Sequence, residues 1–288
     1  MRQEYRQYLT EGETAGSGHR LGLNYENLLG RLGMRSGHQA GISLDFKDYR
    51  EYNPGDDLRH IDWHIYGRTD RLTVKLYREE VYGHLEILLD GSKSMALSTA
   101  KARASLGLSG LFAAAASNAK CTHQAWMVKK DVDKIANGTV RPSLWDEIEL
   151  DYGGNPGQAL LHTPSFRRQG IRVLISDLLW QCEPVSVLMS LSRNAAATVV
   201  VQILAQEDSD PLTHGNVKLR DVETNEILEV LLNDDTRIQY LKALSSLQQD
   251  WYRACQTVGA SFVIMIAEEV VKNWQIQDLH TSQVLEVV

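Results

Sequence analysis

From residue 72 to residue 270 the sequence alternates between short apolar runs and longer segments with a helical pattern, and this alternation limits the possible folds more than any other feature. Runs with the length and pattern of single strands occupy residues 72–77, 85–89, 122–128, 171–175, 198–204 and 261–266. Helical patterns occupy residues 95–119, 185–196 and 234–258. Strands that alternate with helices build a mostly parallel sheet with helices on both faces.

We therefore predict an α/β fold with a doubly wound, mostly parallel sheet over residues 79–288. The last long helix is expected to be capped by Asp234-Asp235-Thr236. Residues 217–232 alternate on either side of a turn at 223–225, which predicts a β-hairpin inserted into this domain.

Residues 1–78 are predicted to form a small N-terminal appendage. Residues 1–20 are polar and contain Gly12, Gly16 and Gly18, so we expect a loose arm there. Residues 21–34 have a helical pattern that Gly30 weakens.

The composition excludes several classes of protein. Hydrophobic residues make up 43% and charged residues 23%, as in a globular protein with a sizeable core. The net charge of -7 argues against a nucleic-acid partner, which needs a basic surface. No stretch approaches the roughly 20 apolar residues of a membrane span, and the polar N-terminus does not resemble a signal peptide. Cys121, Cys182 and Cys255 are too few and too scattered for a disulfide framework or a zinc site, so we expect a reduced, cytoplasmic protein.

Two of the predicted strands end in an acid, Asp90 after residues 85–89 and Asp177 after residues 171–175. In open α/β sheets, ligands bind beyond the carboxyl ends of the strands, so these acids mark the candidate site. Asp90 is followed by Ser92 and Ser94, and such oxygen groups suit a small hard cation such as Mg²⁺. The alternative is that one of the serines simply caps the following helix.

Enzymatic readings of the same loop are weaker. An aspartyl-phosphate phosphatase needs a second acid where Ser92 stands, and the G-x-S-x-G spacing of a hydrolase elbow is absent. The sequence has no G-x-x-x-x-G-K-[ST] loop, so the chain is not itself an ATPase of that class. A metal-dependent hydrolase of the phosphoesterase type, using Asp90 and Asp177, stays open as the alternative to a non-enzymatic interaction module.

Two segments resemble known families. Asp90-Gly91-Ser92-Lys93-Ser94 resembles the metal-ion-dependent adhesion site of von Willebrand factor A domains, whose sheet is Rossmann-like. The run at residues 50–63, REYNPGDDLRHIDW, resembles the signature of the bacterial domain-of-unknown-function 58 (DUF58) family, which joins this signature to an A-type domain. The likeness covers roughly residues 38–270.

The resemblance implies a metal site and a way of using it. The implied ligands of Mg²⁺ or Mn²⁺ are Asp90, Ser92 and Ser94 in the first loop, Asn155 in the second and Asp177 in the third. Asn155 follows Gly153-Gly154 at the place where the family has a threonine, and its side-chain carbonyl can replace the hydroxyl. A carboxylate of a protein partner completes the coordination in such domains. Relatives are commonly coupled to MoxR-type AAA+ ATPases, so we expect an adaptor or co-chaperone of such an ATPase.

The signature itself has a structural and a functional interpretation. Its residues are predicted either to form a buried salt-bridge network anchored by Trp63 or to form a charged contact surface; they are Arg50, Tyr52, Pro54, Gly55, Asp56, Asp57, Arg59, Asp62 and Trp63. Asn53-Pro54-Gly55-Asp56 is predicted to be a turn. His60, Asp62 and His64 fall at alternate positions of a presumed strand, which superficially suggests a second metal site, although the family signature does not require the histidines.

Overall fold

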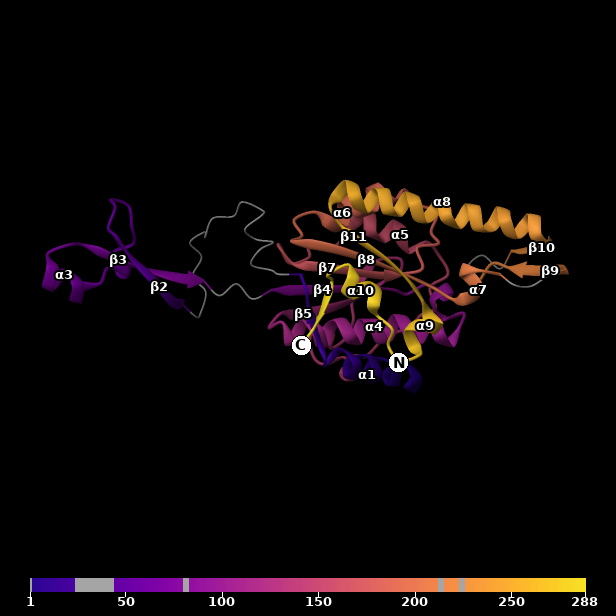
Figure 1. Ribbon diagram of the computed structural model, residues 1–288, viewed down its shortest axis with the longest axis horizontal. Helices are drawn as coiled ribbons and strands as arrows, with labels where there is room; N and C mark the ends of the chain where they lie inside the picture. Colours follow the sequence, from indigo (N-terminus) through magenta and orange to yellow (C-terminus); the bar gives the residue numbers. More distant parts are fainter. Residues whose placement is uncertain (1, 24–43, 80–82, 212–214, 223–225) are drawn as a thin grey trace. The chain divides into compact units, whose positions relative to one another are not determined.

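A computed structural model describes residues 2–23, 44–79, 83–211, 215–222 and 226–288 (Figure 1). The chain divides into two compact units, one of Met1–Leu32 with Gly83–Val288 and one of Gly33–Tyr82. This division differs from the boundary predicted at residue 78, because the start of the chain belongs to the larger, α/β unit.

The larger unit contains a six-stranded, mostly parallel sheet, as the alternating pattern predicted. Its strands, in spatial order, are β11 (Ser261–Ile266), β8 (Ala197–Leu204), β7 (Ile171–Ser176), β4 (His84–Asp90), β5 (Thr122–Val128) and β6 (Val132–Lys134). The short edge strand β6 pairs antiparallel with β5, and the other pairings are parallel. After β4 the chain adds β5 and β6 on one side of β4. It then adds β7, β8 and β11 on the other side, so the strand order reverses between β4 and β7.

Helices cover both faces of this sheet. Figure 1 shows α4 (Thr99–Asn118) and α1 (Gln3–Gly16) on one side, and α6 (Pro184–Ser192) and α8 (Asp234–Val258) on the other. Successive side chains of a strand point to opposite faces, and in β4 Leu85, Ile87 and Leu89 join the core under α4 while Leu88 joins the core under α6 and α8. The near-continuous apolar runs of the sequence are thus explained by burial on two faces.

Short elements connect and extend this framework. They are η2 (Lys93–Ala96), η3 (Pro142–Leu144), α5 (Pro156–Ala159), η4 (Leu160–His162), α7 (Gln206–Ser209), α9 (Ala267–Val271) and α10 (Gln277–Thr281). Near the end of the chain, β12 (Leu285–Val287) pairs antiparallel with β1 (His19–Leu21), a pairing that the sequence analysis missed. Because β1 is extended, the helix predicted from residue 21 does not begin there; its residues from 24 onward lie outside the described part of the chain.

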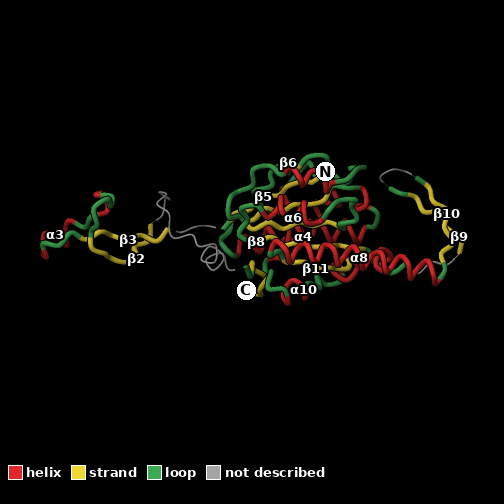
Figure 2. The backbone as a smooth tube through the Cα atoms, turned by 90° about the horizontal axis from the view of Figure 1, so that it is seen from above, coloured by secondary structure: helices red, strands yellow, loops and turns green. Residues whose placement is uncertain are grey.

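The strands β9 (Gly215–Arg220) and β10 (Ile227–Leu232) form a separate antiparallel pair. Figure 2 shows this pair beyond one end of α8, apart from the six-stranded sheet. The turn predicted at residues 223–225 lies outside the described residues. Helix α8 begins where expected, but its cap is Asn233, whose side chain accepts from the backbone N–H of Thr236.

The prediction of a loose arm at residues 1–20 is wrong, because Gln3–Gly16 is helix α1 and packs along α4. Tyr5, Tyr8 and Leu9 of α1 are buried in the core. The glycines that suggested flexibility serve close packing instead: a Cβ added to Gly12 would lie 1.8 Å from the carbonyl oxygen of Gly107. No helix in the described part of the chain is long and apolar enough to span a membrane.

The smaller unit consists of β2 (Leu44–Glu51), η1 (Leu58–His60), α3 (Trp63–Thr69) and β3 (Thr73–Glu79). β2 and β3 pair antiparallel with a bulge near Phe46, and the strand predicted from residue 72 corresponds to β3. The strand presumed at residues 60–64 is wrong, since Asp57 caps η1 and the Asp62 carboxylate accepts from His64 N and Ile65 N at the start of α3. His60 and His64 therefore do not share a strand face with Asp62.

Candidate metal and partner site

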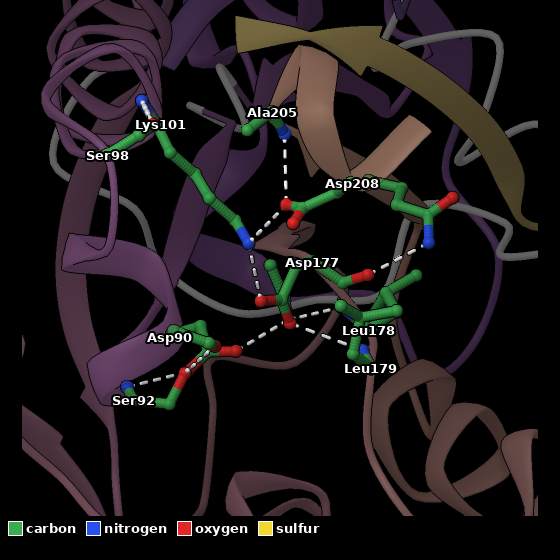
Figure 3. Close-up of polar contacts among 12 residues, drawn as sticks. Asp90, Ser92, Ser98, Lys101, Asp177, Leu178, Leu179, Ala205 and Asp208 are labelled. Carbon is green, nitrogen blue, oxygen red and sulfur yellow. Dashed lines mark hydrogen bonds and ion pairs between the residues drawn. The ribbon is translucent and has the colours of Figure 1, made fainter. Parts of the chain in front are cut away.

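The candidate site lies where the strand order of the six-stranded sheet reverses. Asp90 is the last residue of β4, and Asp177 follows β7 directly. These strands are neighbours in register, with Leu89 beside Ile175, so the two acids meet at the carboxyl ends of adjacent strands. A switch point of this kind is where open α/β sheets bind ligands. Figure 3 shows both acids at this position.

Asp90 is completely buried and its carboxylate accepts three hydrogen bonds. Oδ1 accepts from Ser92 N at 2.8 Å, and Oδ2 accepts from Ser176 Oγ at 2.6 Å and from Trp180 Nε1 at 3.1 Å. Burial, followed by the negative charge of Asp177, nevertheless raises the pKa of Asp90 to about 6. Two buried carboxylates that repel one another form an electrostatic environment that favours a cation.

The two serine hydroxyls of the first loop lie side by side. Ser92 Oγ and Ser94 Oγ are hydrogen-bonded to each other at 2.9 Å. Adjacent oxygen ligands of an octahedral Mg²⁺ are separated by about 2.9 Å when each bond is about 2.05 Å. The loop is held by backbone bonds to Tyr152, which accepts from Lys93 N and donates to Gly91 O, both at 3.0 Å. Asp90, Ser92 and Ser94 thus fit a small divalent cation.

The alternative role of these serines as helix caps has little support in the structure. Helix α4 begins at Thr99, later than predicted, and its cap is Ser98, whose Oγ accepts from Lys101 N at 3.0 Å. Ser92 precedes only the short η2 and makes no side-chain capping bond there.

Asp177 has a partner that the sequence analysis missed. The Lys101 ammonium donates to Asp177 Oδ2 at 2.9 Å and to Asp208 Oδ2 at 2.9 Å. Burial alone lowers the pKa of Lys101, but the charges and hydrogen bonds of Asp177 and Asp208 more than offset it, and the pKa is raised. Lys101 lies in an Ala- and Leu-rich helix. The only sequence feature that indicated a buried ion pair was a lysine in a segment predicted to be buried.

Asn155 does not offer a free carbonyl to this cluster. Its Oδ1 accepts from Gly157 N at 3.0 Å and caps α5, and its Nδ2 donates to Gln181 O at 2.7 Å. Its predicted role as a replacement for threonine is thus not reflected in its contacts. Within the described ranges, no group of three or more His, Cys, Asp or Glu side chains is placed to hold a metal ion. A cation here depends on the serine hydroxyls.

The signature residues make local ion pairs in the smaller unit, and one of these pairs is buried: Asp62 is 5% exposed, and its Oδ2 lies 3.1 Å from Lys75 Nζ. Arg50 pairs with Asp56 at 2.6 Å and Arg59 with Asp57 at 2.7 Å, and the Arg59 side chain is 86% exposed. The hydrogen bond from Arg59 lowers the pKa of Asp57. Trp63 is 61% exposed and is thus not buried within the smaller unit, and its role as an anchor stays a prediction.

The turn predicted in the signature is confirmed. Asp56 N donates to Asn53 O at 3.0 Å, and Gly55 has a φ of 108°. A positive φ at the third residue of a turn, directly after a proline at the second, is typical of a type II turn. Tyr52 continues the strand pairing, since its N–H donates to Leu72 O at 2.9 Å.

Comparison with known proteins gives one family match by sequence and several similar chains by structure. The sequence matches the family described as "Protein of unknown function DUF58" over residues 48–132 and 158–250, together more than half of the chain. No curated protein matches the chain.

Two similar solved structures come from Bacteroides. One is a conserved hypothetical protein, BatB, from Bacteroides thetaiotaomicron, with 13% identity and a TM-score of 0.33 over 69% of this chain and 98% of that one. The other is an aerotolerance-related membrane protein from Bacteroides fragilis, with multiple mutations to serines, at 14% identity and a TM-score of 0.34 over 69% of this chain and 99% of that one. At these values neither likeness bears on function.

Proposed function

The chain belongs to the DUF58 family, whose function is unknown, and from its site we propose that it is a non-enzymatic protein-interaction module. The α/β unit is proposed to be a von Willebrand factor A-type domain with a Rossmann-like, doubly wound sheet. It binds a protein partner through the loops at the carboxyl ends of β4 and β7.

One observation carries this proposal. The hydroxyls of Ser92 and Ser94 lie 2.9 Å apart beside the fully buried Asp90 carboxylate, with the second acid, Asp177, at the end of the neighbouring strand. This arrangement supports the metal site that the resemblance implies, with Mg²⁺ or Mn²⁺ held by Asp90, Ser92 and Ser94. When bound, the cation supplies positive charge for a carboxylate of the partner.

The chain's own residues prepare the loop for this role. Ser176 and Trp180 donate to one oxygen of Asp90 and fix the orientation of its carboxylate. The bonds to Tyr152 fix the backbone of Gly91 and Lys93. A site that is ordered before its partner arrives loses less conformational freedom on binding.

A metal-dependent hydrolase using Asp90 and Asp177 is less well supported. Such an enzyme needs a general base placed to activate water beside the metal. Asp177 is instead engaged by Lys101, and the described residues gather no further His, Cys, Asp or Glu into a metal-holding group. The geometry thus favours binding over hydrolysis.

The resemblance suggests the kind of partner. We propose that it is a MoxR-type AAA+ ATPase, for which this chain acts as adaptor or co-chaperone. Such a partner would meet the chain in the cytoplasm, the location that the sequence predicts.

The test measures binding of the purified chain to the MoxR-type ATPase of the same organism by biolayer interferometry, in millimolar Mg²⁺ and in EDTA. We expect binding in Mg²⁺ that is lost in EDTA and in Asp90→Asn. The matched control is Asp250→Asn, which removes an exposed carboxylate of α8 and should bind as the wild type does. Binding that is insensitive to both EDTA and Asp90→Asn refutes the metal-dependent site, and no binding by the wild type refutes the partner.

A further inference from the structure

The side chain of Lys101 is buried within the α/β unit, with 1% of its surface exposed. A buried ammonium is stable only when it is paired and hydrogen-bonded. Lys101 lies in the first turn of α4, and most of the other buried residues of this helix are Ala, Leu, Ser or Gly. The fixed positive charge of Lys101 therefore acts on the carboxylates of the neighbouring switch point.

The ammonium bridges the loops that follow two adjacent strands. It lies 2.9 Å from Asp177 Oδ2, after β7, and 2.9 Å from Asp208 Oδ2, in α7 after β8 (Figure 3). Asp208 Oδ2 also accepts from Ala205 N at 3.1 Å, which fixes that carboxylate. The other oxygen of Asp177, Oδ1, accepts from Leu179 N at 3.2 Å.

Of the two carboxylates at the switch point, Asp177 is thus partly compensated by the positive charge of Lys101, which it shares with Asp208. A divalent cation beside Asp90, Ser92 and Ser94 is attracted by Asp90 and Asp177 but repelled by the ammonium of Lys101. Coulomb interactions are strong in a buried site, so one positive charge beside Asp177 weakens cation binding substantially.

We infer that the Lys101 ammonium competes with the divalent cation for Asp177 and thereby keeps the metal affinity of the isolated chain low. This inference rests on the proposed metal site. It makes Lys101 a positioning residue rather than a ligand. Its consequence is that the cation is retained only when the partner's carboxylate joins Asp90, Ser92 and Ser94. Metal and partner then bind together.

The experiment titrates the isolated, full-length chain with Mn²⁺ by isothermal calorimetry, without any partner. The first variant is Lys101→Met, which keeps most of the length of the side chain and removes its charge. The second is Lys101→Met with Asp208→Asn, which leaves the net charge unchanged and avoids an unpaired Asp208. Because Asn can still accept from Ala205 N, this double variant is expected to fold better than Lys101→Met alone.

The matched control is Arg103→Met. Arg103 lies on the same helix and pairs with Glu11 of α1 at 2.6 Å, so its removal changes the charge of α4 by the same amount away from the switch point. Asp90→Asn in the double-variant background identifies the site, since any gained binding must disappear there.

We expect the wild type and Arg103→Met to bind Mn²⁺ only in the millimolar range, and the Lys101 variants to bind at least tenfold more tightly. Thermal unfolding should show the same contrast, with Mn²⁺ raising the Tm of the double variant more than that of the wild type. The inference is overturned if the Lys101 variants bind no more tightly than the wild type, or if Arg103→Met produces an equal gain. Because no partner is present, these outcomes are separate from the failure of partner binding.

Discussion

Substituting Gly12 by Ala separates two physical effects of opposite sign. In an isolated helix the change is stabilising by up to about 1 kcal/mol, since Gly is a poor helix former. In α1, however, the new Cβ would lie 1.8 Å from Gly107 O and 2.4 Å from Gly107 C. Atoms in van der Waals contact lie about 3.5 Å apart, so α1 must move away from α4 by more than an ångström.

That movement disturbs the fully buried Leu9 and its neighbours Tyr5 and Tyr8. Overpacking a well-packed core costs about 1–3 kcal/mol, and more where backbone is the obstacle. After the gain in helix propensity, we expect the free energy of unfolding to fall by about 2 kcal/mol. For a unit of this size the Tm should fall by about 4–8 °C.

Thermal and urea unfolding followed by circular dichroism measure this effect. The control is Thr10→Ala on the exposed face of α1, where the same gain in propensity meets no packing obstacle and should stabilise by about 0.5 kcal/mol. If Gly12→Ala raises the free energy of unfolding as Thr10→Ala does, α1 does not pack on α4 as closely as described.

Three further predictions concern a cap, a buried acid and a thiol. Asn233→Ala removes the bond from Thr236 N at 2.9 Å and should lower the free energy of unfolding by about 1 kcal/mol in urea, whereas an unchanged value would contradict the capping role. Burial alone raises the pKa of Glu86, but hydrogen bonds, including those from Arg167 N and Trp126 Nε1, outweigh it, and the pKa is lowered. Its stabilising contribution is therefore present above the unfolded pKa and lost as the pH falls below it, so Glu86→Gln should flatten the decline in stability below about pH 4.5; an equally steep decline would argue against it. Burial raises the pKa of Cys255 to about 12. With Cys121 and Cys182 replaced by Ser, dithiobis(nitrobenzoate) at pH 8 should therefore modify Cys255 only as the protein unfolds, and fast modification of the native protein would show that Cys255 is accessible.

The sheet could be predicted because its signal is local. Each central strand is buried on both faces, so its sequence is an unbroken apolar run, as in residues 171–175, and the acids that end β4 and β7 are visible at once. The parallel pairing of neighbouring strands then places Asp90 and Asp177 near each other without further information.

The N-terminal helix could not be predicted because its signal is tertiary. Gly12 and Gly16 lower helix propensity, and what outweighs this is close contact with Gly107 and Leu111 of a helix distant in the sequence. The segment around Asp62 misled for a different reason. Alternating residues resemble a strand, but an aspartate that accepts two backbone N–H bonds begins a helix instead.

Only part of the candidate site could be predicted from the sequence. The first loop is contiguous, so Asp90, Ser92 and Ser94 could be identified together, whereas Lys101 and Asp208 are separated by more than a hundred residues and meet only through the fold. A lysine in an otherwise apolar helix face is costly to bury, so its presence there predicts that the fold places an acid beside it. Because the acid it meets is Asp177, the same carboxylate that the resemblance assigns to the metal, the chain contains both the proposed cation site and an internal charge that opposes its occupancy.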